Sequence, residues 1–266
     1  MIQRTDAVLL RVFPYSESSQ ILVWLSRDHG KITTLAKGSQ RPKSPMLGHF
    51  DLFYTCEILY YEKEERQLHI LKECFALKDR RSFRTDWRSC AVASYLSHLL
   101  YRINPAQAHQ AGLFESLDWS LDYLHEEKAF APFLFWFELK LLRILGFAPQ
   151  IQRCTSCHTS IADAAGPATF DLEHGGICCS DCKTRHTRHI LPIQPASVAI
   201  LSNWQRSKNP RIAMNTRLDA KQSHDIETLL GRFIEYHLEI PQANRDCALN
   251  IVRHQFANGG CGDFLN

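Results

Sequence analysis

The stretch AVLLRVFPYSESSQILVWLSRDHGKITTLAKG, residues 7–38, contains three apolar runs separated by short polar breaks. The runs AVLLRVF, QILVWLS and KITTLAKG are rich in branched and aromatic residues, and the breaks PYSESS and RDHG contain turn formers. This pattern is typical of short strands joined by tight connections. Two more runs of the same kind, FDLFYTCEILYY and LHILKECFAL, follow before residue 80. We therefore expect five strands in this part of the chain.

Five strands in so short a length favour a small, partly open barrel, and the five-stranded Greek-key oligonucleotide-binding (OB) barrel has this strand count. Strand counting alone leaves an SH3-like barrel and an antiparallel sandwich open. The loop KGSQRPKS, which follows the third run, adds Lys37, Arg41 and Lys43 beside a glycine and a proline. Cations on a loop at a barrel mouth can pair with phosphates. The alternative is a solvated loop that is kept polar for solubility.

After Lys78 the spacing of apolar residues changes to that of amphipathic helices. Helices are expected in WRSCAVASYLSHLLYRI, LFESLDWSLDYLH, FAPFLFWFELKLLRILGF and PASVAILSNWQR, and from about Gln222 through His237. The third of these segments is apolar on nearly every side and ends at Gly146, which predicts the buried central helix of a bundle. Its aromatic residues are interpreted as core.

Composition limits the possible partners and the compartment. The 266 residues carry a net charge of only +3, so that attraction to polyanions must come from local patches. The sequence begins without the pattern of a secretory signal, and no later segment is apolar for long enough to span a bilayer. We therefore expect a cytoplasmic protein with no membrane partner. In that reducing compartment, metal ligation explains clustered cysteines better than disulfides do.

Two CxxC pairs, CTSC and CSDC, are separated by 21 residues. Such knuckles bring four thiolates into a tetrahedron, which suits zinc, and a full Cys₄ shell leaves no open position for water or substrate. We therefore predict a structural zinc site. Its ligands are Cys154, Cys157, Cys179 and Cys182. Cys178 is interpreted as a bystander, because its use would break the two-residue spacing.

Motifs for common catalytic chemistry are absent. The sequence contains no phosphate-binding G-x-x-x-x-G-K-[ST] loop, no G-x-G-x-x-G and no G-x-S-x-G. HxE occurs at His125–Glu127 and at His237–Glu239, but no proline precedes either cysteine pair, which excludes the P-C-x-x-C part of a zinc-deaminase signature. We expect no enzymatic activity. Two alternatives stay open, a zinc-stabilised DNA-processing enzyme such as a nuclease, which would cleave DNA with Mg²⁺, and a protein adaptor or regulator, which would bind bare single strands poorly.

Two further basic segments are candidates for contact with nucleic acid. KDRRSFRTDWR carries Arg80, Arg81 and Arg84 as candidate DNA-binding residues, with aromatic residues between them that either stack on bases or seal a domain interface. A third patch lies beside the cysteine pairs and consists of Arg153, Lys183, Arg185 and Arg188.

The chain resembles the RecO family of bacterial recombination mediators. The resemblance covers AVLLRVFPYSESSQILVWLSRDHGKITTLAKGSQRPKS, FELKLLRILGFAPQIQRCTSC and HGGICCSDC, in that order, and is nearly end to end. FIEYHLEIPQANRD departs from the family's usual histidine-leucine-glycine turn and lysine-serine-arginine segment, and the extra Cys178 is also unusual.

The resemblance implies an α+β multidomain protein that binds single- and double-stranded DNA and promotes strand annealing. It also implies partnership with RecR and with the acidic C-terminal tail of the single-stranded DNA-binding protein, so that RecA is loaded onto coated DNA at the nucleoid. The expected organisation has four parts: an OB-fold DNA-binding barrel (1–79), a helical domain (80–153 and 184–250), an inserted Cys₄ zinc module (154–183) and a C-terminal tail (251–266).

Overall fold

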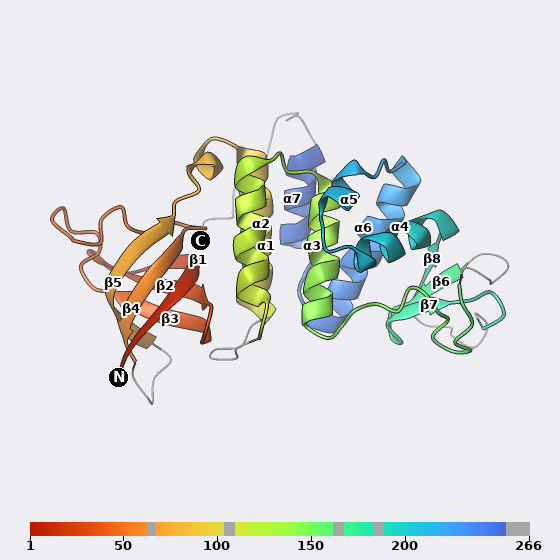
Figure 1. Cartoon of the computed structure of the whole chain (residues 1–266), viewed down its shortest axis with the longest axis horizontal. Helices are drawn as coiled ribbons and strands as arrows, with labels where there is room; N and C mark the ends of the chain where they lie inside the picture. The colour runs from red at the N-terminus through yellow and green to blue at the C-terminus, as the bar shows by residue number, and fades with distance from the viewer. Residues whose placement is uncertain (63–67, 104–109, 162–167, 183–188, 254–266) are drawn as a thin grey trace. The chain divides into compact units, whose positions relative to one another are not determined.

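The computed structural model describes residues 1–62, 68–103, 110–161, 168–182 and 189–253. The chain forms two compact units, unit 1 with residues 1–129 and unit 2 with residues 130–266. Unit 1 contains a β-barrel and the helical segments that follow it, and unit 2 contains a helix bundle with a small sheet (Figure 1). The expected boundary after residue 79 separates strands from helices, whereas contacts group the helices up to residue 129 with the barrel.

Five strands form the barrel of unit 1. They are β1 (Ile2–Ser16), β2 (Ser19–Ser26), β3 (Gly30–Ala36), β4 (Thr55–Tyr61) and β5 (Leu68–Lys78). The barrel is closed in the order β1-β2-β3-β5-β4, and all neighbours are antiparallel except β3 and β5. These two run parallel, with Thr33 opposite Leu68 and Leu35 opposite Ile70. The predicted five-stranded OB barrel is confirmed, and its sheet is closed where a partly open one was expected.

Strand β1 is long because it serves two neighbours. Its first half pairs with β4, beginning with Ile2 opposite Tyr61, and its second half pairs with β2 and ends with Ser16 opposite Ser19. The register with β2 shifts twice, between Leu9 and Arg11 and again close to the end of the strand. Such irregularities bend a strand and increase its twist, which allows a short sheet to close on itself.

The barrel interior is filled by alternate residues of every strand. Trp24 lies at its centre, fully buried, and its Nε1 donates a hydrogen bond of 2.9 Å to Oγ1 of Thr34. The partner is needed because a buried indole N–H without an acceptor would be costly. The other buried apolar members of this core are Ala7, Leu9, Leu22, Ile32, Ala36, Tyr54, Cys56, Ile58, Tyr60, Leu71 and Cys74.

Three helical segments complete the described part of unit 1: the short 3₁₀ helix η1 (Arg81–Arg84), α1 (Trp87–Ile103) and α2 (Leu113–Glu126). Helix α1 buries one face, with Val92, Leu96, Leu99 and Leu100 at helical spacing, and contacts β1. Burial of the outward residues Val8 and Leu10 of β1 is consistent with this contact. The barrel therefore presents only part of its outer surface to solvent.

Unit 2 is built around α3 (Ala131–Ile144), which contacts all the other helices of the bundle. These are α4 (Pro195–Arg206), α5 (Arg211–Asn215), α6 (Ala220–Leu238) and α7 (Ala243–Arg253). Helix α3 buries residues on nearly every side and is followed by Gly146 with φ +82°, which confirms the predicted central helix. The predicted helices α4 and α6 are confirmed as well. Of the expected tail, residues 251–253 belong to α7, and residues 254–266 lie outside the described part of the chain.

The small sheet of unit 2 has the strand order β7-β6-β8. Its strands are β6 (Ala168–Asp171), β7 (Gly176–Cys178) and β8 (Ile190–Ile193). Gly176 pairs with the backbone of Gln150, and a Cβ on Gly176 would lie 2.5 Å from the Gln150 carbonyl oxygen. Only glycine therefore allows this close approach, which fixes the start of β7 beside the first cysteine pair.

Candidate nucleic-acid interface and cysteine cluster

The loop that follows β3 places three cations on the surface of unit 1. Lys37, Arg41 and Lys43 are all exposed, and none has a carboxylate at ion-pair distance among the residues that the structure describes. Gly38 adopts φ +64°, and a Cβ on it would lie 3.3 Å from Cδ of Arg41. The glycine thus provides both the turn and the space over which the Arg41 side chain lies.

The base of this loop is fixed to β2. The backbone N–H of Gly38 donates to Oγ of Ser19 at 3.0 Å, and Oγ of Ser39 donates to Oε1 of Gln20 at the same distance. Further along, the backbone N–H of Phe53 donates to the carbonyl oxygen of Leu9 at 3.1 Å. The cations therefore extend from a loop whose two ends are attached to the barrel.

A hollow of about 630 Å³ opens beside the cations, between β3 and β5. Lys37 and Arg41 line one side, Leu35 and Ile70 line the wall, and Tyr15 lies at the edge with 58% of its surface exposed. The other lining residues are Ser19, Gly38, Leu68 and His69. An exposed aromatic ring next to unpaired cations is the arrangement with which proteins bind unpaired nucleotides.

Sequence interpretation did not single out Tyr15. The residue stands in PYSESS, a segment identified as a turn, and nothing in the sequence places it next to Lys37. The available signal was an aromatic residue in a polar break, and its meaning depends on the pairing of β1 with β2.

Arg80 lies inside unit 1, which corrects its expected role in DNA binding. Its side chain is 1% exposed and makes five hydrogen bonds. Nε donates to Asp122, Nη1 donates to the carbonyl oxygen of Phe53 and to Oγ1 of Thr55, and Nη2 donates to Asp118. A guanidinium with all of these donors engaged has no capacity left for a phosphate. Its role is to join β4 to α2.

Arg81 and Arg84 are exposed, as a contact with nucleic acid requires, but each already has a carboxylate partner. Arg81 binds Asp79 at 2.5 Å, and Arg84 binds Asp51 at 2.8 Å. The Asp51 carboxylate raises the pKa of Arg84, which keeps it charged. Exposed ion pairs of this kind contribute little stability, so that a phosphate can replace the carboxylate at small cost.

The aromatic residues between these arginines differ from one another in exposure. Phe83 is buried and packs edge to face on Phe53, with ring centroids 5.4 Å apart. Of the two expected roles, stacking on bases or sealing an interface, the packing of Phe83 fits the second. Trp87, at the start of α1, is 40% exposed. Of the third basic patch, Arg153 is exposed, and Lys183, Arg185 and Arg188 lie outside the described residues.

The four predicted metal ligands come together in unit 2. The sulfur atoms of Cys154, Cys157, Cys179 and Cys182 all lie within 4.8 Å of one another. The first pair precedes β6 and the second follows β7, so that the strands bring the two pairs together. Cys178 is buried and is not a member of this group.

Backbone amides face the sulfurs, as expected for CxxC knuckles. The N–H of Ser156 donates to Sγ of Cys154 at 3.4 Å, and the N–H of Cys179 donates to the same sulfur at 3.5 Å. Although burial opposes ionisation, amide hydrogen bonds lower the pKa of Cys154 to about 6. Burial and the neighbouring thiols raise the pKa of Cys182 to about 12. Four neighbouring thiols cannot all lose their protons without strong repulsion between the negative charges. A bound cation is therefore needed to stabilise all four as thiolates.

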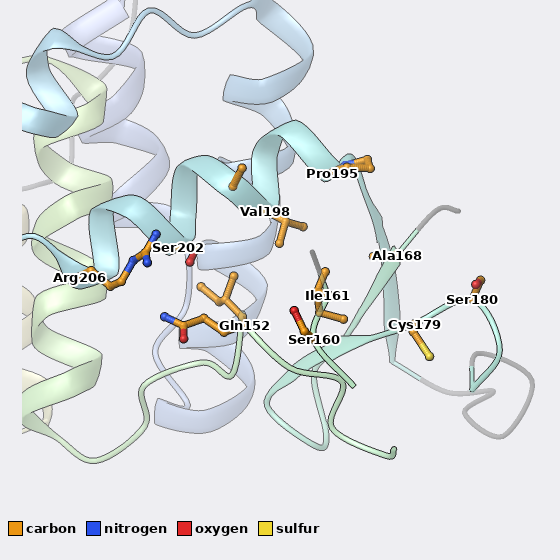
Figure 2. Close-up of a pocket in the computed structure, with 12 residues that line it drawn as sticks. Gln152, Ser160, Ile161, Ala168, Cys179, Ser180, Pro195, Val198, Ser202 and Arg206 are labelled. Carbon is orange, nitrogen blue, oxygen red and sulfur yellow. The ribbon is translucent and has the colours of Figure 1, made fainter. Parts of the chain in front are cut away.

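Among the hollows of the described helix bundle, two border α4. One, of about 420 Å³, lies between α3 and the end of α4, with an apolar floor that includes Trp136 and Trp204 and with Lys140, Arg143 and Lys208 among its lining residues. The other, of about 520 Å³, lies between α4 and the cysteine module. In Figure 2, Arg206 and Ser202 lie on α4 at one end of this second hollow, and Cys179 and Ser180 lie at the other.

Each helix in the described part of the chain is too short or too polar to span a membrane.

The fold and the site together define a class: OB-barrel proteins with a cationic loop at the barrel and a four-cysteine cluster in a separate helical unit. Residues 1–79 match the family described as "Recombination protein O N terminal", and residues 84–246 match the family described as "Recombination protein O C terminal". The chain belongs to the RecO family.

Proteins named DNA repair protein RecO in several bacteria are similar to this chain. The chain is 28% identical to the DNA repair protein RecO of Desulforudis audaxviator over 236 residues, which cover 89% of this chain and 92% of the relative. It is 33% identical to that of Rhodopirellula baltica over 180 residues, 66% of each chain. For Chlorobium luteolum the identity is 26% over 257 residues, 94% of this chain and 97% of the relative.

Proposed function

We propose that this protein is a non-enzymatic recombination mediator of DNA repair. In this role it binds single- and double-stranded DNA, anneals complementary strands and, with RecR, helps to load RecA onto single strands coated by the single-stranded DNA-binding protein. The observation that carries the proposal is the set of three exposed cations, Lys37, Arg41 and Lys43, beside a hollow with an exposed aromatic ring on an OB barrel. Membership of the RecO family supports a role in DNA repair.

Phosphates of a bound strand would pair with the loop cations, and a base would stack on Tyr15. Each phosphate contact with a single strand contributes about 0.7 to the salt slope, and each stacked base contributes about 1–3 kcal/mol. Arg81 and Arg84 extend the proposed DNA-binding surface. Arg80 is left out because its donors are all engaged. None of these contacts reads a base edge, so that the surface would accept any sequence, as annealing requires.

The hollow between α3 and α4 suits the acidic tail of the single-stranded DNA-binding protein. Trp136 and Trp204 offer an apolar floor to hydrophobic residues of the tail, and Lys140, Arg143 and Lys208 offer charge to its carboxylates. Burial lowers the pKa of Lys140, because the charged amine has lost part of its hydration. A carboxylate of the tail would stabilise the charged form and would itself be bound more tightly. An amphipathic acidic peptide satisfies both requirements.

The cysteine cluster would hold a structural zinc ion. A tetrahedral site with Zn–S bonds of about 2.3 Å separates its sulfurs by about 3.8 Å. Sγ of Cys157 lies 3.7 Å from Sγ of Cys179, which fits. Because four thiolates complete the shell, the ion would link the two knuckles and leave no open position for substrate. A closed metal site of this kind is consistent with a protein that acts by binding. We place that action in the cytoplasm at the nucleoid, where the DNA is.

The decisive experiment is annealing of complementary oligonucleotides by the purified protein, with and without the single-stranded DNA-binding protein, in EDTA-free buffer without nucleotide. We expect annealing to accelerate under both conditions. Substitution of Lys37, Arg41 and Lys43 by alanine should reduce the acceleration. An absolute requirement for ATP, or cleavage of either strand when Mg²⁺ is added, would contradict the proposal.

A further inference from the structure

A second group of cations surrounds Tyr101, at the end of α1 and on a different part of the barrel surface from the loop. Cζ of Arg11 lies 5.7 Å from the centroid of the Tyr101 ring, and Nζ of Lys31 lies 5.1 Å from it. Arg102 follows in the chain and is exposed. Throughout the described ranges, no carboxylate lies at ion-pair distance from any of the three cations.

Neutral groups, not acidic ones, receive the hydrogen bonds of this cluster. Nη2 of Arg11 donates to Nδ1 of His98 at 2.8 Å, and Nζ of Lys31 donates to the carbonyl oxygen of Tyr101 at 2.9 Å. Because arginine can only donate, Nδ1 of His98 is the acceptor and its proton is on Nε2. Burial, Arg11 and Arg102 together lower the pKa of His98 to about 4, which keeps the ring neutral.

The two inner cations are partly removed from water without a compensating charge. Burial lowers the pKa of Arg11, which the Tyr101 hydroxyl offsets only in part, and burial also lowers the pKa of Lys31. Like charges brought together and desolvated in this way are costly unless an anion joins them. Each still has donors to offer, since within the described part of the chain the guanidinium donates one hydrogen bond and the ammonium donates one.

The position of the cluster indicates which anion it receives. Lys31 lies at the start of β3, and Lys37 follows its end. A strand rises by about 3.3 Å per residue, so that the backbone positions of Lys31 and Lys37 are about 20 Å apart along it. Phosphates about 3.4 Å apart along a stacked strand would cover this span in about six nucleotides. OB barrels occupy about 4–16 nucleotides, so that one strand can reach both groups of cations.

We propose that Arg11, Lys31 and Arg102 form a second phosphate-binding site, which holds the backbone of the same single strand that contacts the loop cations. This proposal rests on the proposed function, because it assigns the path of the strand on the barrel. The guanidinium and the ammonium bind phosphodiester oxygens, and Tyr101 holds the two cations at a fixed spacing.

Two oligonucleotide lengths test the proposal. The double variant Arg11→Gln, Lys31→Gln removes two phosphate contacts, so that the salt slope for a strand of about 12 nucleotides should fall by roughly 1.4, while a strand of about four nucleotides at the loop keeps its slope. The control is Arg4→Gln, Lys72→Gln, which removes two exposed barrel cations that are paired with Glu57 and Glu73. A wild-type slope for the long strand in the double variant overturns the proposal.

A measurement on the unaltered protein covers the case in which the double variant fails to fold. Acetylation of Lys31 is followed by mass spectrometry with no ligand, with the long strand and with inorganic phosphate, and Lys72 serves as the internal reference. We expect the long strand to protect Lys31. Equal acetylation with and without a bound long strand, or equal protection by phosphate alone, overturns a strand-binding role. Failure of wild-type protein to bind any oligonucleotide would instead refute the proposed function itself.

Discussion

Arg245 binds Glu138 through two parallel hydrogen bonds, with Nε 2.7 Å from Oε1 and Nη2 3.0 Å from Oε2, although both side chains are almost completely buried. The pair joins α7 to α3 at the centre of unit 2. Gly231 on α6 makes room for it, since a Cβ there would lie 2.9 Å from Nη1 of Arg245. Each charge in such a pair depends on the other for its solvation.

Removal of one partner should therefore strongly destabilise unit 2. We expect Glu138→Ala to lower the free energy of unfolding by about 3–5 kcal/mol, because the guanidinium stays buried without its anion. Chemical denaturation followed by circular dichroism measures the change. Replacement of both residues, Glu138→Leu with Arg245→Met, should recover most of the loss. Arg232→Ala, which breaks an exposed pair with Glu235, is the control and should change stability by less than about 0.5 kcal/mol.

Arg80 and its sequence neighbour Arg81 should differ sharply. Arg80→Ala leaves Asp118 and Asp122 without their buried partner, and we expect unit 1 to lose about 3–5 kcal/mol of stability. Arg81→Ala removes an exposed ion pair and should change stability by less than about 0.5 kcal/mol. Thermal unfolding of the two variants gives the comparison. Equal melting temperatures would show that Arg80 does not hold α2 on the barrel.

The same cluster should make unit 1 sensitive to acid. Burial opposes ionisation of Asp118, but hydrogen bonds from Lys78, Thr55 and Arg80 outweigh it and lower its pKa. A carboxyl group whose pKa is depressed by folding adds stability above its unfolded pKa of about 3.9, and this stability is lost as the pH falls through the folded value. We therefore expect unfolding to become easier below about pH 4. Asp118→Asn should flatten this dependence, and an unchanged acid limb in that variant would exclude Asp118 as its source.

Removal of the three loop cations should weaken binding to DNA and make that binding less dependent on salt concentration. The triple variant Lys37→Ala, Arg41→Ala, Lys43→Ala removes up to three phosphate contacts, so that the salt slope for a single strand should fall by roughly 2. Fluorescence anisotropy at several salt concentrations measures it. A triple variant at Arg4, Lys72 and Arg232, exposed cations with carboxylate partners, is matched in charge and should keep the wild-type slope.

Chelation of the metal should act on unit 2 alone. If the cysteine cluster holds zinc, its removal should increase amide exchange around Cys154 and Cys179 and leave the barrel protected, because binding of the ion contributes to the local folding free energy. Zinc affinity should also fall as the pH is lowered, since the ligands are thiolates. Cys157→Ser should abolish stoichiometric zinc, and Cys90→Ser, outside the cluster, should not. Loss of barrel protection together with the module would contradict the separation of the two units.

The main helices and strands were predictable because the apolar spacing typical of each one recurs several times along its segment. The strands of the barrel, the apolar helix α3 and the helix opened by Pro195 all carry patterns that local sequence alone determines. The two CxxC spacings likewise predicted the cluster before any geometry was known, because knuckle spacing is itself a local constraint.

Residues whose role depends on tertiary contacts were not predictable in this way. Arg80 and Arg81 are adjacent and identical in type, yet one is buried and the other is exposed. The difference comes from Asp118 and Asp122 on α2, far away in the sequence. Tyr15 was missed for the same reason, because only the register of β1 with β2 brings it to the loop cations.

The parallel pairing of β3 with β5 is short, since it spans only three residue pairs, from Thr33 opposite Leu68 to Leu35 opposite Ile70. This seam is closed by residues far apart in the sequence, and it is therefore where we expect the barrel to open most readily by local unfolding. The hollow beside the loop spans the seam, with Leu35 on one strand and Ile70 on the other. A molecule held there would contact both strands, and its binding would oppose their separation. Occupancy of the hollow and local opening of the barrel would then be linked equilibria, so that tighter binding would lower the population of the opened barrel.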